Sequence, residues 1–440
     1  MPGSFRLNGA FNQDLAKITM IDLKLNQAQE IRAGLVSLLQ REPKGFTATS
    51  CFQSGKLPEL LESKNDTNAI SIGLSAQRKQ SFGIEIRVYS KGAVELAKTM
   101  AKQVDEELKI DSVPKSPVFI RVAKPGRMFN ATSRDPKLEA FDKHLQPHRK
   151  KNRPLFIGQA IGNLTNRHIG TVSIGGFVVL KNSEIGILSA SHGLIGLGET
   201  GGDVGNRVSQ PHYHETKYPD ASDVFGHILF ASALKPDSET VCDAAVVGVR
   251  QNPDKKDEKL VLGNYIPKKT FDPDLTTHLS SRGMPDDFFG SRILPTESLD
   301  FYSKKDVEQG RVYKIGAGSG WSAGELGAQG GFTDMTDKGE TYRFMNTIEV
   351  RGLKKAKKDP KKIQFSNDGD SGALVFYRRG KHLYALGLII GQLDVTNLNR
   401  RSGRMAVYET ISIVCPLLSI NEFLNAKSHS CVWMDSEYGE

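Results

Sequence analysis

Three residue types that together support nucleophilic acyl transfer occur in separate segments of the chain. Ser371 lies in the stretch NDGDSGAL (367–374), where Gly369 and Gly372 allow a tight turn that can bring two backbone N–H groups together. Such a turn fixes the serine hydroxyl and can stabilise an oxyanion, an effect worth about 3–4 kcal/mol for each donor. By itself the tetrapeptide GDSG is equally consistent with an ordinary β-turn.

A serine nucleophile needs a base, and the base needs an acid that orients it. His192 follows an apolar run that ends in small residues (GILSASHG, 186–193), and Asp243 begins another (CDAAVVGV, 242–249). Taken singly, His192 is typical of a structural or surface histidine, and Asp243 is typical of a cap at a strand edge. Asp243 follows His192 by 51 residues and Ser371 follows Asp243 by 128. All three stand at strand edges in a glycine-rich region, and the combination favours a His–Asp–Ser triad.

Short strands must position these residues. From about residue 155, glycines become frequent, and apolar runs of strand length recur between Gly, Pro, Asn and Asp breaks, which is typical of an all-β barrel or sandwich. The runs are 170–180, 184–188, 224–230, 244–249, 343–350, 372–377 and 384–391. A final helix is predicted at 420–426.

The region before residue 126 has a different pattern. Residues 21–41 have apolar positions at helical spacing and predict an amphipathic helix that packs on a core, with a partner-binding helix as the alternative. Residues 82–89 alternate as in a half-buried strand, 94–108 predict a helix and 117–123 a second strand. No glycine-rich phosphate loop separates the first strand from the helix, so this strand–helix–strand unit is not typical of a nucleotide fold.

The order His192, Asp243, Ser371 resembles that of the chymotrypsin/trypsin-like serine proteases. LSASHG stands where that family has a TAAHC-like motif, CDAAVV where it has a DIAL-like motif, and GDSG is the family's nucleophile motif unchanged. The stretch VSIGGFVVL (172–180) is similar to the strand that precedes the histidine strand.

The resemblance implies a mainly β fold, a chymotrypsin-like double β-barrel, here with an N-terminal α/β accessory region. It implies that Ser371 attacks a peptide carbonyl, that His192 carries the proton and that Asp243 holds the imidazole tautomer. The backbone N–H groups of Gly369 and Ser371 would form the oxyanion hole. The implied activity is that of a serine endopeptidase acting on a protein or peptide substrate, without a cofactor or metal.

Several positions depart from the digestive members of that family. Members that cut after Lys or Arg have an acid six residues before the serine, where this chain has Phe365. With Ile390 and Gly391 it predicts a substrate pocket for an uncharged, apolar side chain. Those relatives also pair the Asp before the serine with a new Ile N-terminus. No motif for that activation is present, so Asp370 needs another partner, or the turn forms only when something binds.

A narrower resemblance is to the plant narrow-leaf trypsin-like proteases and their bacterial relatives. It is carried by Gln210-Pro211 after His192 and by VYKIGAGSGWSAGELGA (312–328). That family has a small α/β region ahead of a double barrel. The predicted organisation is a helical segment at 1–80, a small α/β domain with a basic linker at 81–150, the protease double barrel at 151–430 and a tail at 431–440. The N-terminal region is predicted to bind a regulatory partner.

Length and composition exclude several other classes of protein. The 440 residues are 25% charged and 38% hydrophobic, enough for two or three domains with a sizeable core. No apolar run is long enough for a membrane span and the N-terminus lacks a signal-peptide pattern, so a cytoplasmic protein without membrane contact is predicted. The four cysteines are too few for a disulfide scaffold.

Weaker signals have ordinary interpretations. Cys242, beside Asp243, is predicted to be a small buried hydrophobic residue rather than a redox group. His212 and His214 are predicted to lie in a loop, since no third metal ligand has suitable spacing. The stretch GAGSGW (316–321) is similar to a phosphate loop but follows no βαβ pattern, and a β-turn in the second barrel is predicted.

The net charge of +9 is concentrated in two stretches. Residues 351–362 have seven basic and one acidic residue, and residues 147–153 have four basic and none acidic, which leaves 48 basic and 49 acidic residues elsewhere. The first stretch is a candidate docking loop for substrate or partner. The alternative function is an idle protease-fold scaffold that binds protein or nucleic acid through these basic loops, but they lack interleaved aromatic residues for base stacking.

Overall fold

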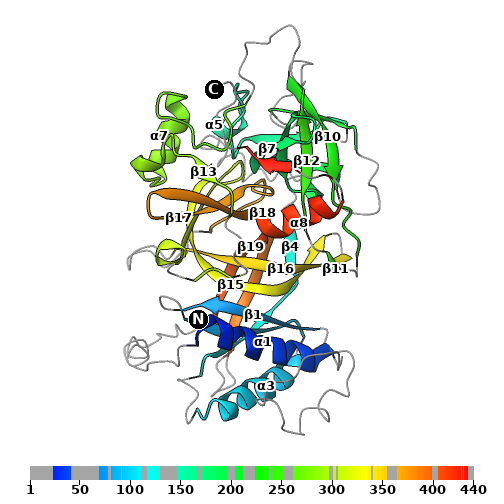
Figure 1. Ribbon diagram of the computed structural model, residues 1–440, viewed down its shortest axis with the longest axis vertical. Coiled ribbons are helices and arrows are strands. Elements are labelled where there is room, and N and C mark those ends of the chain that lie inside the picture. The colour runs from blue at the N-terminus through cyan, green and yellow to red at the C-terminus, as the bar shows by residue number, and fades with distance from the viewer. Residues whose placement is uncertain are drawn as a thin grey trace, which may run out of the picture. The chain divides into compact units, whose positions relative to one another are not determined.

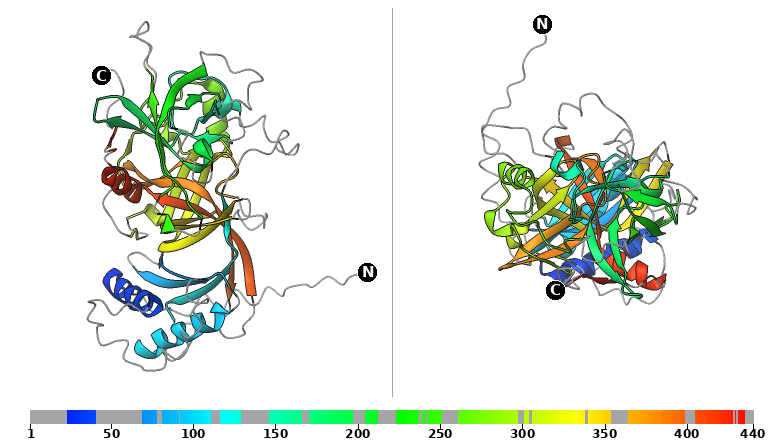
Figure 2. Two further views of the ribbon diagram at one scale, coloured as in Figure 1. Left: turned by 90° about the vertical axis from the view of Figure 1, so that its right-hand side faces the viewer. Right: turned by 90° about the horizontal axis from the view of Figure 1, so that it is seen from above.

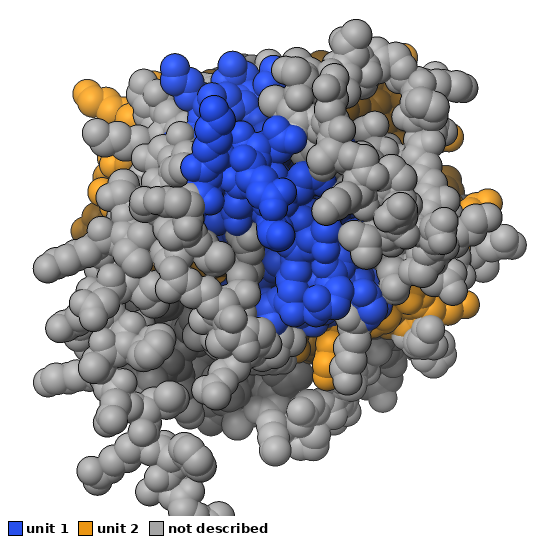
Figure 3. Space-filling model, turned by 90° about the horizontal axis from the view of Figure 1, so that it is seen from below, with its two compact units in different colours: residues 1–123, 396–408 blue, residues 124–395, 409–440 orange. Residues whose placement is uncertain are grey.

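The computed structural model divides the chain into two compact units. Unit 1 comprises residues 1–123 and 396–408, and unit 2 comprises residues 124–395 and 409–440; Figure 3 colours them separately. The structure describes residues 23–40, 69–77, 81–90, 92–110, 116–128, 146–165, 170–196, 204–211, 223–236, 239–240, 242–250, 261–296, 301–303, 306–337, 340–353, 364–398, 405–427, 429 and 431–434.

Unit 1 is an α/β unit. It contains α1 (Leu25–Gln40), β1 (Ile70–Ala76), β2 (Phe82–Val88), α3 (Ala93–Glu107) and β3 (Val118–Ala123). β1 pairs antiparallel with β2, and β2 pairs parallel with β3 across α3. Figures 1 and 2 show both helices on one face of this small sheet. The predicted helices at 21–41 and 94–108 and the strand–helix–strand unit are confirmed.

One expectation for β2 is wrong. Its alternating pattern predicted a half-buried strand, but all seven residues are buried. The charged positions are buried in ion pairs: the carboxylate of Glu85 lies 3.5 Å from Arg87 and 3.2 Å from Arg121 of β3. Buried charges persist only when they are paired in this way.

The first sheet of unit 2 has eight strands in the order β20–β7–β8–β12–β10–β9–β5–β6. β6 and β7 are halves of one run interrupted by Ile174 and Gly175. β6 pairs with β5 and β7 pairs with β8, so the sheet curls back on itself. The bounds are β5 (Ala160–Asn163), β6 (Val172–Ser173), β7 (Gly176–Leu180), β8 (Ile185–Ser189), β9 (Arg207–Ser209), β10 (Val224–Ala231), β12 (Ala245–Val249) and β20 (Cys431–Trp433).

In the second sheet of unit 2, six strands pair in a closed cycle. The order is β16–β19–β18–β17–β14–β15, and β15 pairs back with β16. A closed cycle removes the exposed edges that an open antiparallel sheet would have. The bounds are β14 (Arg311–Gly316), β15 (Gly320–Asp337), β16 (Glu340–Gly352), β17 (Leu374–Arg379), β18 (His382–Leu398) and β19 (Met405–Pro416).

Short elements complete unit 2. The predicted C-terminal helix is confirmed as α8 and begins three residues earlier than expected. Among the described residues, no helix has the length and apolar character needed to cross a membrane. The elements are β4 (Gly126–Met128), α5 (Gln146–Arg149), α6 (His192–Ile195), β11 (Glu239–Thr240), α7 (Pro273–Ser281), η8 (Asp286–Phe288), β13 (Ile293–Leu294), η9 (Glu308–Gly310) and α8 (Leu417–Ala426).

The chain is therefore mainly β, with two curled sheets in unit 2 and an α/β region in unit 1. This agrees with the class predicted from the recurrence of short apolar runs after residue 155. The apolar runs of that region that form strands in the structure all lie in one of these two sheets.

Candidate active site

The first sheet brings His192 and Asp243 to one place. His192 begins α6, three residues after β8 ends, and Asp243 stands two residues before β12 begins. β8 and β12 pair antiparallel, with Ser189 opposite Ala245. The end of one strand therefore lies beside the start of the other, and two side chains 51 residues apart in sequence meet there.

Ser371 completes a chain of hydrogen bonds with these two residues. Nε2 of His192 lies 2.8 Å from Oγ of Ser371, and Nδ1 forms a short hydrogen bond with Oδ2 of Asp243. The backbone N–H of His192 donates to the other carboxylate oxygen at 3.0 Å. When Nδ1–H is donated to Asp243, Nε2 keeps a lone pair that can accept the serine proton. The structure thus brings together all three residues of the predicted triad.

This cluster is enclosed by protein. Asp243 and Ser371 are 0% exposed, and His192 is 4% exposed. A buried carboxylate must be compensated by hydrogen bonds, and His192 supplies two of them to Asp243. A Cβ on Gly193 would approach a methyl group of Val172 more closely than 3.0 Å, so glycine is the residue that fits after the histidine.

Two glycines shape the turn that carries Ser371. The carbonyl of Asn367 accepts from Asp370 N–H at 3.0 Å, and Gly369 has φ of 91°, a conformation that favours glycine. Gly372 has φ of 78°, and a Cβ there would come closer than 3.0 Å to Oγ of Ser189. Backbone freedom at these positions was predicted from the sequence, but the close approach to β8 appears only in the folded chain.

The predicted oxyanion hole consists of the N–H groups of Gly369 and Ser371. The N–H groups that alternate with them are engaged inside the protein: Asp370 donates to Asn367, and Gly372 donates to Ile389 at 2.8 Å. Within the described part of the chain, the N–H of Gly369 meets no protein acceptor. The turn can therefore present this donor to a ligand, although its role as an oxyanion donor stays a prediction.

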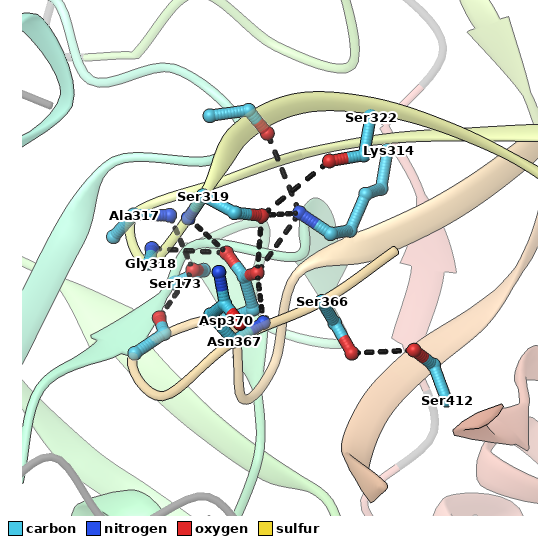
Figure 4. Close-up of polar contacts among 12 residues, drawn as sticks. Ser173, Lys314, Ala317, Gly318, Ser319, Ser322, Ser366, Asn367, Asp370 and Ser412 are labelled. Atoms are coloured by element: carbon cyan, nitrogen blue, oxygen red, sulfur yellow. Dashed lines mark hydrogen bonds and ion pairs between the residues drawn. The ribbon is translucent and has the colours of Figure 1, made fainter. Parts of the chain in front are cut away.

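Ser173 of β6 connects the first sheet to the nucleophile turn. Its backbone N–H donates to the carbonyl of Ser371 at 2.7 Å, and its hydroxyl donates to the carbonyl of Gly369 at 2.9 Å. The N–H of Ala317 donates to the same hydroxyl at 2.9 Å, as Figure 4 shows. One serine thus holds the turn and the β14–β15 hairpin together.

Asp370 has the internal partner that the sequence left open. Its carboxylate lies 3.0 Å from Nζ of Lys314, and both side chains are 0% exposed. The hydroxyl of Ser319 donates to Oδ2 at 2.6 Å, and the N–H groups of Gly318 and Ser319 donate to Oδ1 at 2.9 and 3.0 Å. The N–H of Asn367 donates to Oδ2 at 2.8 Å. Asp370 therefore anchors the nucleophile turn through five interactions (Figure 4).

Lys314 is satisfied on its own side of the pair. Its ammonium donates to the Ser319 hydroxyl at 2.6 Å and to the carbonyl of Gly320 at 3.4 Å, and it lies 5.8 Å from the ring centroid of Phe365. Burial lowers the pKa of Lys314 from its ordinary value, and Asp370 acts in the opposite direction. We take the lysine to be charged near neutral pH because a carboxylate and two oxygen acceptors surround it.

The stretch 316–321 forms the predicted β-turn, and it also has a role in the site. It closes the β14–β15 hairpin with Gly316 opposite Gly320. A Cβ on Gly316 or Gly318 would collide with Asp370 or with the backbone of the nucleophile turn. The sequence reasoning did not identify this cradle or Lys314. The available signal was a lysine in an apolar strand two residues before a glycine-rich turn.

The residues predicted to form the substrate pocket lie in different surroundings. Phe365 is 1% exposed and packs against Gly324 and Lys314, beneath the Asp370 network. Ile390 is buried in β18, and Gly391 is covered by the backbone of Arg127. Their role in substrate recognition, and the predicted preference for an uncharged side chain, stay predictions.

Of the other groups singled out in the sequence, the structure describes Cys242 but not the two histidines. Cys242 is 1% exposed, as predicted for a small buried hydrophobic residue. Burial raises the pKa of Cys242 far above its ordinary value and that of Cys415 to about 12, so both thiols are unreactive near neutral pH. His212 and His214 lie outside the described residues. Across the residues that the structure does describe, no group of three or more His, Cys, Asp or Glu side chains is arranged to hold a metal.

Both lysines of the basic stretch at 147–153 are paired with acids of the same unit. Lys150 lies 2.9 Å from Asp272 and 3.3 Å from Asp274, and Lys151 lies 2.8 Å from Asp223. These ion pairs leave less free positive charge for a nucleic acid than the sequence suggested. Residues 354–362 of the second basic stretch lie outside the described residues.

Comparison with known proteins finds similar solved structures but no matching family. No model of a known protein family matches the chain, and no curated protein is similar to it in sequence. A solved Nocardiopsis protease is similar at 17% identity and a TM-score of 0.35, over 64% of this chain and 98% of its own. The murine norovirus NS6 protease, an inactive mutant, is similar at 10% identity and a TM-score of 0.22, over 54% and 95%.

Both of these structures are proteases with the chymotrypsin-like fold, the class predicted from the sequence. Because both TM-scores are below 0.5, the case for a function rests on the site of this chain alone. The narrower resemblance to the plant narrow-leaf proteases stays a prediction.

Proposed function

We propose that this chain is a serine endopeptidase that acts through His192, Asp243 and Ser371. One observation carries the proposal: the serine hydroxyl lies 2.8 Å from an imidazole nitrogen whose other nitrogen is bound to a buried carboxylate. A nucleophile, a base and an orienting acid in this order of contact are the requirements for acyl transfer. Each is held by a different strand end, so the arrangement is fixed by the fold.

The proposed reaction begins when Oγ of Ser371 attacks a peptide carbonyl carbon. His192 takes the hydroxyl proton on Nε2, and Asp243 stabilises the resulting imidazolium. The carbonyl oxygen, now negatively charged, accepts from the N–H groups of Gly369 and Ser371. The C–N bond then breaks as His192 returns the proton to the leaving amine, and an acyl-enzyme remains. Water, deprotonated by His192, releases the acid by the same route.

The pair of Lys314 and Asp370 supports an enzyme that needs no new N-terminus to form its site. The activation mode of the digestive relatives supplies a cation to the Asp before the serine, and here Lys314 lies 3.0 Å from that carboxylate. The nucleophile turn is therefore held by an interaction present from the moment of folding. Regulation by the N-terminal region is a separate part of the proposal.

A fluorophosphonate probe tests the reactivity of the serine directly. The probe should label the purified protein at Ser371, and Ser371→Ala should abolish both labelling and hydrolysis of a casein substrate. Ser366→Ala is the matched control, because Ser366 is also fully buried and its hydroxyl bonds that of Ser412 at 2.6 Å, away from His192. Hydrolysis that persists in the Ser371→Ala variant would sink the mechanism.

One observation favours a second candidate, a protease fold that binds without cleaving. Ser371 is 0% exposed, so its hydroxyl is closed to substrate in this conformation. An idle scaffold would show salt-dependent binding of duplex DNA or an acidic protein and no hydrolysis. The pairing of Lys150 and Lys151 with acids argues against the nucleic acid.

A further inference from the structure

A short strand of the chain itself lies on the strand that flanks the nucleophile turn. β4 (Gly126–Met128) pairs antiparallel with β18, with Arg127 opposite Gln392 and Met128 opposite Gly391. It also pairs parallel with β15 through Gly126 and Met335. This three-residue strand therefore lies between two strands of the second sheet of unit 2.

The part of β18 that β4 pairs with begins next to Ser371. The N–H of Gly372 donates to the carbonyl of Ile389 at 2.8 Å, and the N–H of Ile389 donates to the carbonyl of Ala373 at 3.0 Å. Gly391 and Gln392 follow two and three residues later. An extended peptide that binds by adding a strand to this part of β18 would run along Gly391 and Gln392 as it approaches Oγ of Ser371.

A side-chain contact fixes β4 on the nucleophile side of β18. Nη1 of Arg127 lies 3.4 and 3.3 Å from the two carboxylate oxygens of Asp368, three residues before Ser371. The side chain of Asp368 is only 27% exposed, and burial raises its pKa while Arg127 lowers it. A carboxylate in such a place needs a cation, and here Arg127 supplies it.

The backbones of the two strands come very close. A Cβ on Gly391 would approach the carbonyl of Arg127 more closely than 3.0 Å, and a Cβ on Gly126 would do the same to the carbonyl of Gln392. Glycine on each strand thus permits main-chain contact without a side chain between. This is the approach that a bound peptide backbone makes, and it coincides with the complete burial of Ser371.

We propose that residues 126–128 are an internal peptide bound in the position of the substrate, and that Asp368 selects a basic side chain at the matching residue of peptides that replace it. The inference rests on the proposed function, since it concerns the same site. A peptide substrate must displace β4, and a basic residue opposite Gln392 takes over the ion pair that Arg127 leaves.

Probe labelling tests the internal peptide. Arg127→Glu places a like charge opposite Asp368 and should raise the rate of fluorophosphonate labelling at Ser371 about fivefold, the upper range for an exposed ion pair. Gly126→Val should do the same by crowding Met335 and Gln392. The matched control is Arg207→Glu, because Arg207 is an exposed arginine of β9 in the first sheet.

A peptide series tests the selection by Asp368. Fluorogenic peptides carry Arg, Gln or Glu at one of the four positions before the cleaved bond, and each position is varied in turn. One position should favour Arg over Glu about fivefold in kcat/KM, and Asp368→Asn should remove that preference. Because Asp368→Asn also releases Arg127, the rates for all three peptides are compared within each variant. Unfolding midpoints are measured for every variant, so that loss of folding is recognised.

The outcomes separate the two proposals. Suppose that Ser371 is labelled in every variant, and that Arg127→Glu and Gly126→Val are labelled no faster than Arg207→Glu. The internal peptide is then overturned and the serine hydrolase stands. If the variants are faster but Asp368→Asn keeps the Arg preference, the assignment of Asp368 is overturned. If no folded variant is labelled at Ser371, the proposed function fails and this inference fails with it.

Discussion

Lys314 and Asp370 form an ion pair at 3.0 Å in which both side chains are fully buried. The carboxylate belongs to the turn that carries the nucleophile, and the ammonium belongs to β14, 56 residues earlier in the chain. Breaking such a pair from one side leaves a charge in a place that water does not reach. This geometry makes the turn dependent on a residue that touches none of the three residues of the proposed triad.

Removal of the Lys314 charge should destabilise the protein strongly. We expect Lys314→Met to lower the free energy of unfolding by about 3–5 kcal/mol, measured by urea denaturation, because methionine cannot donate to Asp370, Ser319 and Gly320 as the amine does, whether charged or neutral. The double variant Lys314→Met with Asp370→Asn should recover a large part of that loss. Lys269→Met, which removes an exposed partner of Asp286, should change the value by at most about 1 kcal/mol. A double variant as unstable as the single one would contradict the role of the pair.

The same lysine should set an alkaline limit to activity. Burial lowers the pKa of Lys314 below 10.5, so activity should fall at a pH below that value as the proton leaves and Asp370 loses its counter-ion. Between the lowered pKa of Lys314 and 10.5, the unfolded chain binds more protons than the folded chain. The titration of Lys314 itself therefore makes the free energy of unfolding rise with pH in this range. Over this pH range, the measured activity should fall, while the Lys314 contribution to the free energy of unfolding, measured with urea, should rise.

Lys314→Arg provides the test of that assignment. Arginine keeps its proton beyond pH 12, so a folded variant should have its alkaline limit moved to higher pH. An unchanged limit would show that another group sets it.

Gly372 should be intolerant of a side chain for two separable reasons. Gly372→Ala introduces strain at φ of 78° and a close contact with Ser189, and it should abolish most labelling of Ser371. Gly380→Ala is the matched control: φ is 62°, but a Cβ there would meet nothing within 4 Å. The control should lose only about 1–2 kcal/mol of stability, from the left-handed strain, and should still be labelled at Ser371. Equal effects on labelling would contradict the role of the close approach.

Asp243 should act by orienting His192. Asp243→Asn should lower kcat by about four orders of magnitude with little change in fold, because an amide can stabilise the wrong imidazole tautomer. Asp274→Asn, at an exposed acid of α7 that pairs with Lys150, should leave kcat unchanged. Stopped-assay kinetics measure kcat, and circular dichroism shows whether each variant is folded. A fully active Asp243→Asn enzyme would show that the acid is not part of the mechanism.

The predictions made from short patterns agree with the structure where the pattern depends on nearby residues. The strand runs after residue 155, the helices at 21–41 and 94–108, and the hairpin turn at 316–321 are confirmed because apolar periodicity and glycine positions act locally. The half-buried assignment of β2 is wrong because burial of its polar side depends on Arg121, a residue from another strand.

Residue order in the sequence placed His192, Asp243 and Ser371 in one hypothesis, and each residue's chemistry limited what the site could do. Their meeting depended on the pairing of β8 with β12 and on the hydrogen bonds of Ser173, which join segments far apart in the chain. The partner of Asp370 and the position of β4 on Gly391 were likewise decided by tertiary contacts alone. Local patterns record backbone preferences, whereas a buried charge finds its counter-ion only when the packed chain has excluded water.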